Sequence, residues 1–545
     1  MTINALTELP PVWQELINHA KEICTPENHL RRITCDEGRI ESYSLNRCGM
    51  FYDFSRQRVT GRTMELLFEL ARQREIQKTF LAMTNGKKVN TTENRAALHT
   101  AARDFSRQTL MVDDVDVMPE FKRVLSEIEE FTRAIHDGAI TGTTGKSFRH
   151  VVVIGIGGSY LGTEFVARAL GAYADKDIIL HFLSNVDIHN FGEIAGRIDL
   201  ETTLWIVVSK SFTTAETMAN ANQAREFMEA RHLKAADHFV AVTSKGSPGD
   251  VPPDQAAFPV RRSFHMFDFI GGRYSVSSAV GGLPLSLYIG FDRFKAFLEG
   301  AHEMDVYTQN AAPEENIPMI AALISIWNNN FLGYRAQAII PYAAPLAELA
   351  PHIQQLYMES NGKSVTADGR PVPINTGVII FGEPGTNAQH SFFQLAHQGS
   401  QGSPFPIDFI GMINPQYPDY TCKSKGVTNH QELWANLISQ PKALAEGREG
   451  DSLHRSFSGN RPSSTIILNS LFPKSIGRLL AFYEARTVYE AFVWGINPFD
   501  QFGVELGKKL AGDIRAQMAA ANENPDHTFD DTDPISKFYL EMLMQ

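Results

Sequence analysis

The stretch Val151–Leu170, "VVVIGIGGSYLGTEFVARAL", decides how this chain folds. A β-branched apolar run leads into a cluster of glycines, and the glycines lead into a helical pattern of apolar residues. This order of strand, glycine turn and helix is typical of an α/β protein with a parallel sheet. Glycines let a backbone approach a ligand closely, and the free N–H groups at the start of a helix favour an anion. The stretch therefore predicts an α/β fold and indicates a phosphate-binding loop.

The glycine spacing does not fit the common nucleotide-binding loops. A dinucleotide loop needs G-x-G-x-x-G, but Gly155 and Gly157 are followed by Tyr160 at the third glycine position. A triphosphate loop that begins at Gly157 needs Lys and then Ser or Thr, but Thr163 and Glu164 stand there. For this stretch alone, a tight turn without a ligand remains the alternative.

The same strand, loop and helix pattern recurs in two series along the chain. The first contains "RHVVVIGIGGS", "DIILHFLS", "TLWIVVSKS" and "FVAVTSK", and the second contains "RAQAIIPY", "TGVIIFGEPG", "PIDFIGMI" and "STIILNSL". We expect two doubly wound parallel-sheet domains of the αβα sandwich type. The expected boundaries are a helical N-terminal segment over 1–120, a smaller domain over 121–290, a larger domain over 291–515 and a tail over 516–545.

Composition and charge exclude several classes of protein. The 545 residues are 43% hydrophobic and 21% charged, as in an ordinary globular protein with room for two domains. The net charge of −12 opposes binding to nucleic acid or to anionic membranes, so an anionic substrate needs a local positive pocket. The four cysteines show no C-x-x-C pair and no metal-ligand spacing. No signal peptide is apparent, and the longest uncharged stretch contains Pro284 and paired glycines, so we expect a cytoplasmic protein without membrane or nucleic-acid partners.

A second candidate anion loop follows the run "TLWIVV" and precedes a predicted helix. Four hydroxyls and one ammonium group gather within six residues: Ser209, Lys210, Ser211, Thr213 and Thr214. Several short donors at a helix N-terminus suit a phosphate monoester. Helix capping is the alternative, and it accounts for one or two of the hydroxyls.

Four further residues could carry chemistry, each with a structural alternative. In "FIGGRYSVSS", Gly272 allows close approach, and Arg273 presents a charge to a developing anion or sits in an ion pair. Glu359, expected just past a helix, is a base or a solvated cap. His390, expected at the top of a helix, is a catalyst or a packed cap. Lys508 is expected on one helix face with Gln501, where most lysines are solvated.

Seven segments, taken in order, resemble the phosphoglucose isomerase family, also called the glucose-6-phosphate isomerase family, in its bacterial type. They are "GIGGSYLG", "SKSFTTAET", "FIGGRYSVSSAVG", "MESNGKSV", "GEPGTNAQH", "GNRPSS" and "FDQFGVELGK". Such an ordered set is very specific. The resemblance implies an aldose–ketose isomerase that interconverts D-glucose 6-phosphate and D-fructose 6-phosphate through a cis-enediol intermediate.

The resemblance also implies where the substrate binds. Gly158, Ser159 and the segment 209–214 would hold the sugar phosphate, and Gln355 and Gln501 would lie beside the sugar. Neither a cofactor nor a metal is expected, because moving a proton between adjacent carbons needs a base and a positive stabiliser.

The catalytic roles come from the same resemblance. Glu359 would move the proton between C1 and C2, while Arg273 and the Gly272 backbone would stabilise the enediolate. His390 and Lys508 would assist ring opening and closing. In this family the histidine is similar to one supplied by the partner subunit, so a homodimer with a shared site is implied.

Some features depart from the family pattern, and other functions stay open. Ser211 replaces the usual Thr, Phe502 replaces the usual Trp, and the polar excursion over 419–459 is shorter than in bacterial relatives. The alternatives are an isomerase for amino-sugar or mannose phosphates, a sugar-phosphate-binding regulator without chemistry, and a nicotinamide oxidoreductase, which Tyr160 disfavours. A glutamine-using enzyme would need an N-terminal cysteine, and residue 2 is Thr.

Overall fold

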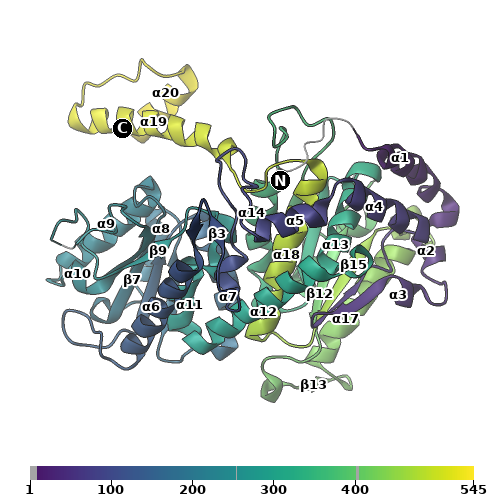
Figure 1. Ribbon diagram of the computed structural model, residues 1–545, viewed down its shortest axis with the longest axis horizontal. Coiled ribbons are helices and arrows are strands. Elements are labelled where there is room, and N and C mark those ends of the chain that lie inside the picture. Colours follow the sequence, from purple (N-terminus) through teal and green to yellow (C-terminus); the bar gives the residue numbers. More distant parts are fainter. Residues whose placement is uncertain (1–8, 253, 401–403, 545) are drawn as a thin grey trace. The chain divides into compact units, whose positions relative to one another are not determined.

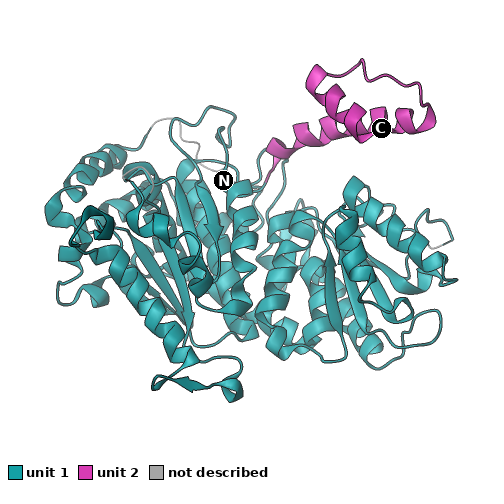
Figure 2. Ribbon diagram, turned by 180° about the vertical axis from the view of Figure 1, so that it is seen from behind, with its two compact units in different colours: residues 1–499 teal, residues 500–545 magenta. Residues whose placement is uncertain are grey.

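The computed structural model describes residues 9–252, 254–400 and 404–544 (Figure 1). The chain forms two compact units, Met1–Phe499 and Asp500–Gln545, which Figure 2 colours separately. The first unit contains both large sheets, and the second consists mainly of two helices.

The first large sheet has five parallel strands in the order β6-β5-β7-β8-β9. The strands are β5 (His150–Ile154), β6 (Ile179–Leu183), β7 (Thr203–Val208), β8 (Phe239–Ser244) and β9 (Ser263–Met266). Val151 and Val153 pack into a core with helices α6 (Met118–His136) and α11 (Ala279–Ile289). Val152 and Ile154 pack into a second core with α8 (Ile188–Ala195) and α9 (Ala215–Glu229). Successive residues of a strand point to opposite faces of the sheet, so these two cores lie on opposite faces and helices cover both. The predicted αβα layering is confirmed for this sheet.

The second large sheet has six strands in the order β1-β2-β15-β12-β10-β11. The strands are β1 (Ser44–Arg47), β2 (Met50–Asp53), β10 (Ala336–Pro341), β11 (Ile379–Gly382), β12 (Ile407–Met412) and β15 (Ser463–Leu468). The last four are mutually parallel, but β2 pairs antiparallel with both β1 and β15. The N-terminal segment, expected to be helical, therefore also supplies a hairpin at one edge of this sheet. The proposed boundaries at 120, 290 and 515 stay predictions.

Helices and two small hairpins complete the chain. The helices not yet given are α1 (Pro11–Ile23), α2 (Leu30–Ile33), α3 (Arg39–Ser42), α4 (Gly61–Gln73), α5 (Ile76–Thr84), α7 (Leu161–Ala169), α10 (Ala235–His238), α12 (Phe291–Asn310), α13 (Ile317–Ile326), α14 (Leu349–Asn361), α15 (Gly385–Gln389), α16 (Phe393–Gln398), α17 (Asn429–Glu446), α18 (Pro473–Trp494), α19 (Glu505–Glu523) and α20 (Pro534–Leu543). The hairpins are β3 (Met111–Val112) with β4 (Val115–Asp116) and β13 (Lys423–Ser424) with β14 (Val427–Thr428).

Helix α18 is buried along nearly its whole length, as expected for a helix at the centre of a large domain. It packs closely on α12 at Gly477, where an added Cβ would lie 2.0 Å from the Phe297 carbonyl oxygen, so no larger residue fits there without a shift. Its buried Glu484 and Arg486 are paired, Glu484 with Arg103 at 2.7 Å and Arg486 with Asp408 at 2.6 Å. Pairing offsets the high cost of burying these charges.

No helix in the described ranges combines the length and apolar content that a membrane crossing needs. The uncharged stretch noted in the sequence forms the 3₁₀ turn Gly272–Ser277 and the short helix α11, in which Pro284 lies inside the helix.

Candidate active site

The glycine loop follows β5 and leads through the 3₁₀ turn Gly157–Ser159 into α7, so the predicted order of strand, turn and helix is confirmed. Gly157 has φ of +59°, which glycine adopts at little cost. A Cβ added at Gly158 would lie 2.2 Å from the carbonyl carbon of Gly272. Only glycine permits this contact, which places the first loop beside Arg273.

Arg273 and Glu359 form the centre of the site. Arg273 is 2% exposed, and its Nη1 donates to Glu359 Oε2 at 3.1 Å. Its Nε donates to Ser360 Oγ at 2.7 Å, and its Nη2 donates to the Pro498 carbonyl at 2.5 Å. Three separate anchors hold the guanidinium in one orientation. Arg273 therefore forms an ion pair, which was the structural alternative to a role in stabilising an anion. Its partner is Glu359, the residue expected to act as the base.

Glu359 lies inside α14, and the expectation that it follows the helix is wrong. The helix continues to Asn361, and the N–H of Gly362 still donates to the Met358 carbonyl at 2.9 Å. The Glu359 side chain is 27% exposed. This carboxylate is thus partly buried and paired with a fixed cation, which is unlike a solvated surface group.

Gln355 lies one turn before Glu359 on the same face of α14. Its Nε2 is 3.4 Å from Glu359 Oε2, and a Cβ added at Gly157 would lie 3.1 Å from this nitrogen. Its buried Oε1 has no hydrogen-bond partner among the described residues. Buried polar atoms are normally satisfied, so this oxygen is available to accept a hydrogen bond from a ligand hydroxyl.

The second loop, Ser209–Thr214, connects β7 to α9, as predicted. Thr214 occupies the N-cap position, but its side chain accepts no capping hydrogen bond from the described part of α9. Its Oγ1 instead lies 3.2 Å from Ser209 Oγ. The capping alternative is therefore wrong for Thr214, and the N–H groups that begin α9 lack a side-chain cap.

The remaining polar groups of this loop make local contacts. Thr213 donates to Ser211 Oγ from its hydroxyl at 2.7 Å and from its backbone N–H at 3.3 Å. Lys210 Nζ lies 3.2 Å from the Asp268 carbonyl and 3.3 Å from its carboxylate. Ser211 and Thr213 are exposed to solvent. The loop thus presents the hydroxyls of Ser211 and Thr213 at the surface, whereas Ser209 is buried.

His390 ends a short helix, whereas the sequence placed it at the top of one. It is the C-terminal cap of α15, and its N–H donates to the Asn387 carbonyl at 2.9 Å. Its side chain is exposed. Within the described part of the chain, the polar contacts of Glu359 are with Arg273 and Gln355, so the structure does not join His390 to Glu359.

Gln501 and Lys508 lie in the second unit, Asp500–Gln545. The expectation that they share one helix face is wrong. Gln501 has a non-helical backbone, with φ of −151° and ψ of 45°, and precedes the 3₁₀ turn Phe502–Val504, and α19 begins only at Glu505. Lys508 lies in the first turn of α19, and both side chains are exposed.

Sequence reasoning missed two residues that support the Arg273–Glu359 pair. Ser360 is fully buried, and its hydroxyl contacts both Arg273 and, at 3.0 Å, the hydroxyl of Tyr274. Burial raises the pKa of Tyr274 to about 12, so this phenol stays protonated. Both are sequence neighbours of the predicted residues, but a side chain's partner across the fold leaves no local pattern.

Known proteins match this chain over nearly its whole length. The phosphoglucose isomerase family model matches residues 53–533. A glucose-6-phosphate isomerase of Desulfosudis oleivorans is 68% identical over 544 residues, which cover 100% of this chain and 99% of that protein. A cytosolic glucose-6-phosphate isomerase of Arabidopsis thaliana is 43% identical, with 97% and 96% covered.

A solved structure agrees. The crystal structure of a glucose-6-phosphate isomerase from Chlamydia trachomatis superposes with a TM-score of 0.88 at 36% identity and covers 99% of both chains. The resemblance drawn from seven sequence segments is confirmed, and the chain belongs to the phosphoglucose isomerase family.

Proposed function

We propose that this chain interconverts D-glucose 6-phosphate and D-fructose 6-phosphate by opening the sugar ring and moving a proton through a cis-enediol intermediate. The chain is an isomerase by family, and its relatives carry the name glucose-6-phosphate isomerase. The intermediate and the residue roles are the proposal. The observation that carries it is the fixed contact between a buried arginine and a partly exposed glutamate beside the glycine loop.

The pair supplies the two groups that the proton transfer needs. Glu359 takes the proton from C2 of the opened aldose and returns it to C1, while a proton moves from the oxygen on C2 to the oxygen on C1. Charge that develops on the enediolate oxygens is stabilised by Arg273 and the Gly272 backbone. The electrons stay within the substrate, so the step balances without a hydride carrier. The anchors on Arg273 support this role because a stabiliser that is already oriented needs no reorganisation.

The two loops bind the phosphate in this proposal. The hydroxyls of Ser209 and Thr214 and the start of α9, where Thr214 gives no side-chain cap, meet the phosphate oxygens. The backbone of Gly158 and Ser159 is assigned to the same phosphate. Gln355 and Gln501 contact the sugar hydroxyls, and the unsatisfied Oε1 of Gln355 supports the first of these contacts. Binding energy at the remote phosphate then holds C1 and C2 against Glu359.

Ring opening is assigned to His390, with Lys508 near the ring oxygen, in a homodimer whose site takes the histidine from the partner subunit. His390 is exposed at the end of α15, so a second subunit can reach it. This supports a role in the partner's site and not beside the Arg273–Glu359 pair of the same chain. Large apolar side chains on α19 and α20 are also exposed, including Leu506 at 67% and Phe538 at 63%, which suits an interface. A cytoplasmic location is proposed because plant relatives are named cytosolic.

The direct test is an assay of the purified protein with fructose 6-phosphate and a coupled readout of glucose 6-phosphate, with and without a chelator. We expect equal rates in both conditions. Failure to form glucose 6-phosphate would contradict the function, and loss to chelator with recovery on adding metal would contradict the metal-free route. Mannose 6-phosphate and glucosamine 6-phosphate, assayed in parallel, test the neighbouring isomerase functions.

A further inference from the structure

Phe212, in the middle of the Ser209–Thr214 loop, has a left-handed backbone. Its φ is +54°, a region that residues other than glycine rarely occupy. Its side chain is 3% exposed although Ser211 and Thr213 on either side are exposed. A strained residue persists only where its surroundings hold it, and such residues cluster at functional loops. What holds Phe212 therefore also sets the shape of the loop.

The Phe212 ring is held by a second segment, residues 243–250, here called the support loop. A Cβ added at Gly249 would lie 2.5 to 2.7 Å from three atoms of the ring. The ring also meets Phe258 edge-on at 5.9 Å. The backbone at Gly249 is therefore flat against Phe212, and no larger residue fits without moving the ring.

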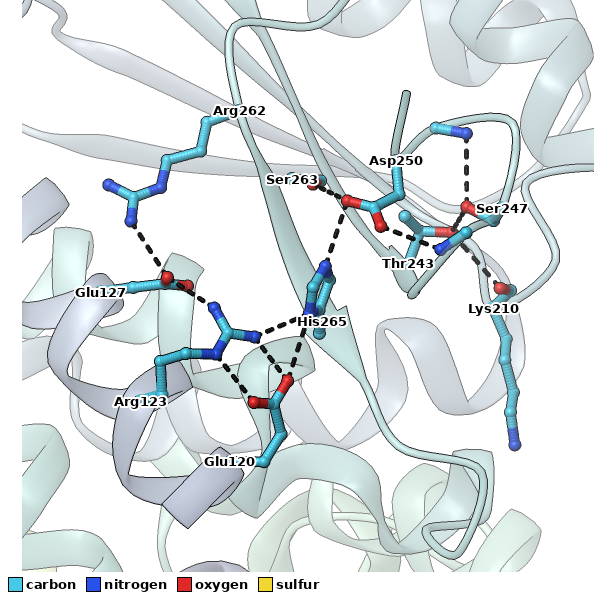
Figure 3. Close-up of polar contacts among 12 residues, drawn as sticks. Glu120, Arg123, Glu127, Lys210, Thr243, Ser247, Asp250, Arg262, Ser263 and His265 are labelled. Carbon is cyan, nitrogen blue, oxygen red and sulfur yellow. Dashed lines mark hydrogen bonds and ion pairs between the residues drawn. The ribbon is translucent and has the colours of Figure 1, made fainter. Parts of the chain in front are cut away.

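The support loop also holds the backbone at Lys210 (Figure 3). The Lys210 carbonyl accepts from Thr243 Oγ1 at 3.3 Å. It also accepts from the Ser244 N–H at 3.1 Å. Thr243 Oγ1 is 2.7 Å from Ser247 Oγ, which in turn accepts from the Gly249 N–H at 3.3 Å. The hydrogen bonds at Lys210 and the ring contact at Phe212 are thus connected through one loop.

Asp250 anchors the far end of the support loop (Figure 3). Its carboxylate accepts from the Gly246 N–H at 2.9 Å and from the Ser263 hydroxyl, and it lies 3.1 Å from His265 Nε2. His265 Nδ1 lies 2.7 Å from Arg123 Nη2 on α6. The same Nδ1 lies 3.4 Å from Glu120 Oε1, so α6 faces His265 with a guanidinium and a carboxylate. The support loop is therefore tied to β9 and, through His265, to α6.

We propose that Phe212 is a positioning residue and that the support loop, through Gly249, holds the Ser209–Thr214 loop in its phosphate-binding shape without touching the substrate. This inference rests on the proposed role of that loop in binding the sugar phosphate. It predicts that a change at Gly249 weakens phosphate binding and spares the proton transfer at Glu359.

The experiment is Gly249→Ala, with KM and kcat for fructose 6-phosphate and the inhibition constant of inorganic phosphate. Gly249 has an ordinary φ, so the added methyl acts by colliding with the Phe212 ring. We expect KM and the inhibition constant to rise about tenfold, as for one lost hydrogen bond to a charged group, with kcat changed less than about twofold. The matched control is Gly192→Ala on α8, where the added Cβ meets no atom within 4 Å, and both constants should stay unchanged.

Rescue tests the route of the effect. The double variant Gly249→Ala with Phe212→Leu removes the ring that collides, so its KM should return to that of Phe212→Leu alone. Asp250→Asn, which loosens the anchor without a collision, should raise KM in the same direction by a smaller factor, and it serves if Gly249→Ala does not fold. Lower thermal stability with unchanged KM and phosphate inhibition in the folded variants would overturn the proposal.

The variant Thr214→Ala distinguishes a failure of this inference from a failure of the proposed phosphate site. If Thr214→Ala raises KM and Gly249→Ala does not, the phosphate site stands and the support-loop inference fails. If Thr214→Ala leaves both constants unchanged, the phosphate site lies elsewhere and both proposals fail.

Discussion

The Arg273–Glu359 pair and the Ser209–Thr214 loop differ in how the chain builds them. The pair joins residues 86 positions apart, and its arginine is buried and anchored by three groups. The loop is one continuous segment in which Ser211 and Thr213 are exposed, and the buried ring of Phe212 within it packs against Gly249. The arginine that needs one fixed geometry for chemistry is buried and anchored across the fold, whereas the loop proposed to meet the phosphate keeps part of its hydroxyls open to solvent. Substitutions in the pair should therefore change turnover, and substitutions in the loop should change affinity.

The largest expected effect comes from Glu359→Gln, which keeps the shape of the pair and removes the base. We expect kcat to fall by about 10² to 10⁴, because the amide cannot accept the proton. Inhibition by inorganic phosphate should stay within a few-fold of the parent. Exchange of the C2 hydrogen of glucose 6-phosphate with deuterated solvent measures the step directly, and normal exchange in this variant would show that another residue is the base.

His390→Ala tests whether ring opening is separate from the pair. We expect a loss of about 10² or more in turnover of the cyclic sugar phosphate, because a positioned imidazole moves the ring proton near neutral pH. Turnover of a shorter ketose phosphate that cannot close a ring should be spared, as should binding of a phosphorylated hydroxamate that mimics the enediolate. Equal losses on cyclic and open-chain substrates would contradict the division of labour.

Arg273→Lys tests the anchoring of the pair. The ammonium keeps the charge but cannot contact Ser360, Glu359 and the Pro498 carbonyl together, so we expect about 10² lower kcat and weaker binding of the hydroxamate mimic. Ser360→Ala, which removes one anchor only, is the graded control and should lose less. An Arg273→Lys variant with parental kcat would show that charge alone is sufficient.

The smallest expected effect on turnover is on the loop side. Thr214→Ala should weaken substrate and inorganic phosphate alike by about 1 to 3 kcal/mol, with kcat nearly unchanged, if its hydroxyl meets a charged oxygen. Substrate KM and phosphate inhibition measure it. A fall in kcat at unchanged KM would place Thr214 with the pair and break the comparison.

Much of the fold could be predicted because many of its strands are short apolar runs with β-branched residues, a pattern that can be recognised in the sequence. The runs that form β5, β7, β12 and β15 were all identified from the sequence. The strands β1 and β2 were missed because Ser44–Arg47 is short and polar, and its place depends on β2 pairing with β15 more than four hundred residues away. The end of α14 was misplaced because "ESNG" favours a break, yet Ser360 and Asn361 are fully buried in the fold and remain helical.

In the candidate site, too, some features could be predicted from the sequence and others could not. The sequence by itself determined the α/β class, the two loops before α7 and α9, and the resemblance to the family, because each is encoded by neighbouring residues in a local order. Only the tertiary structure decided that Arg273 contacts Glu359, that Gly158 meets Gly272, and that Gly249 lies against Phe212. These contacts join distant segments, and their geometry is set by how the sheets and helices pack, which no local periodicity records.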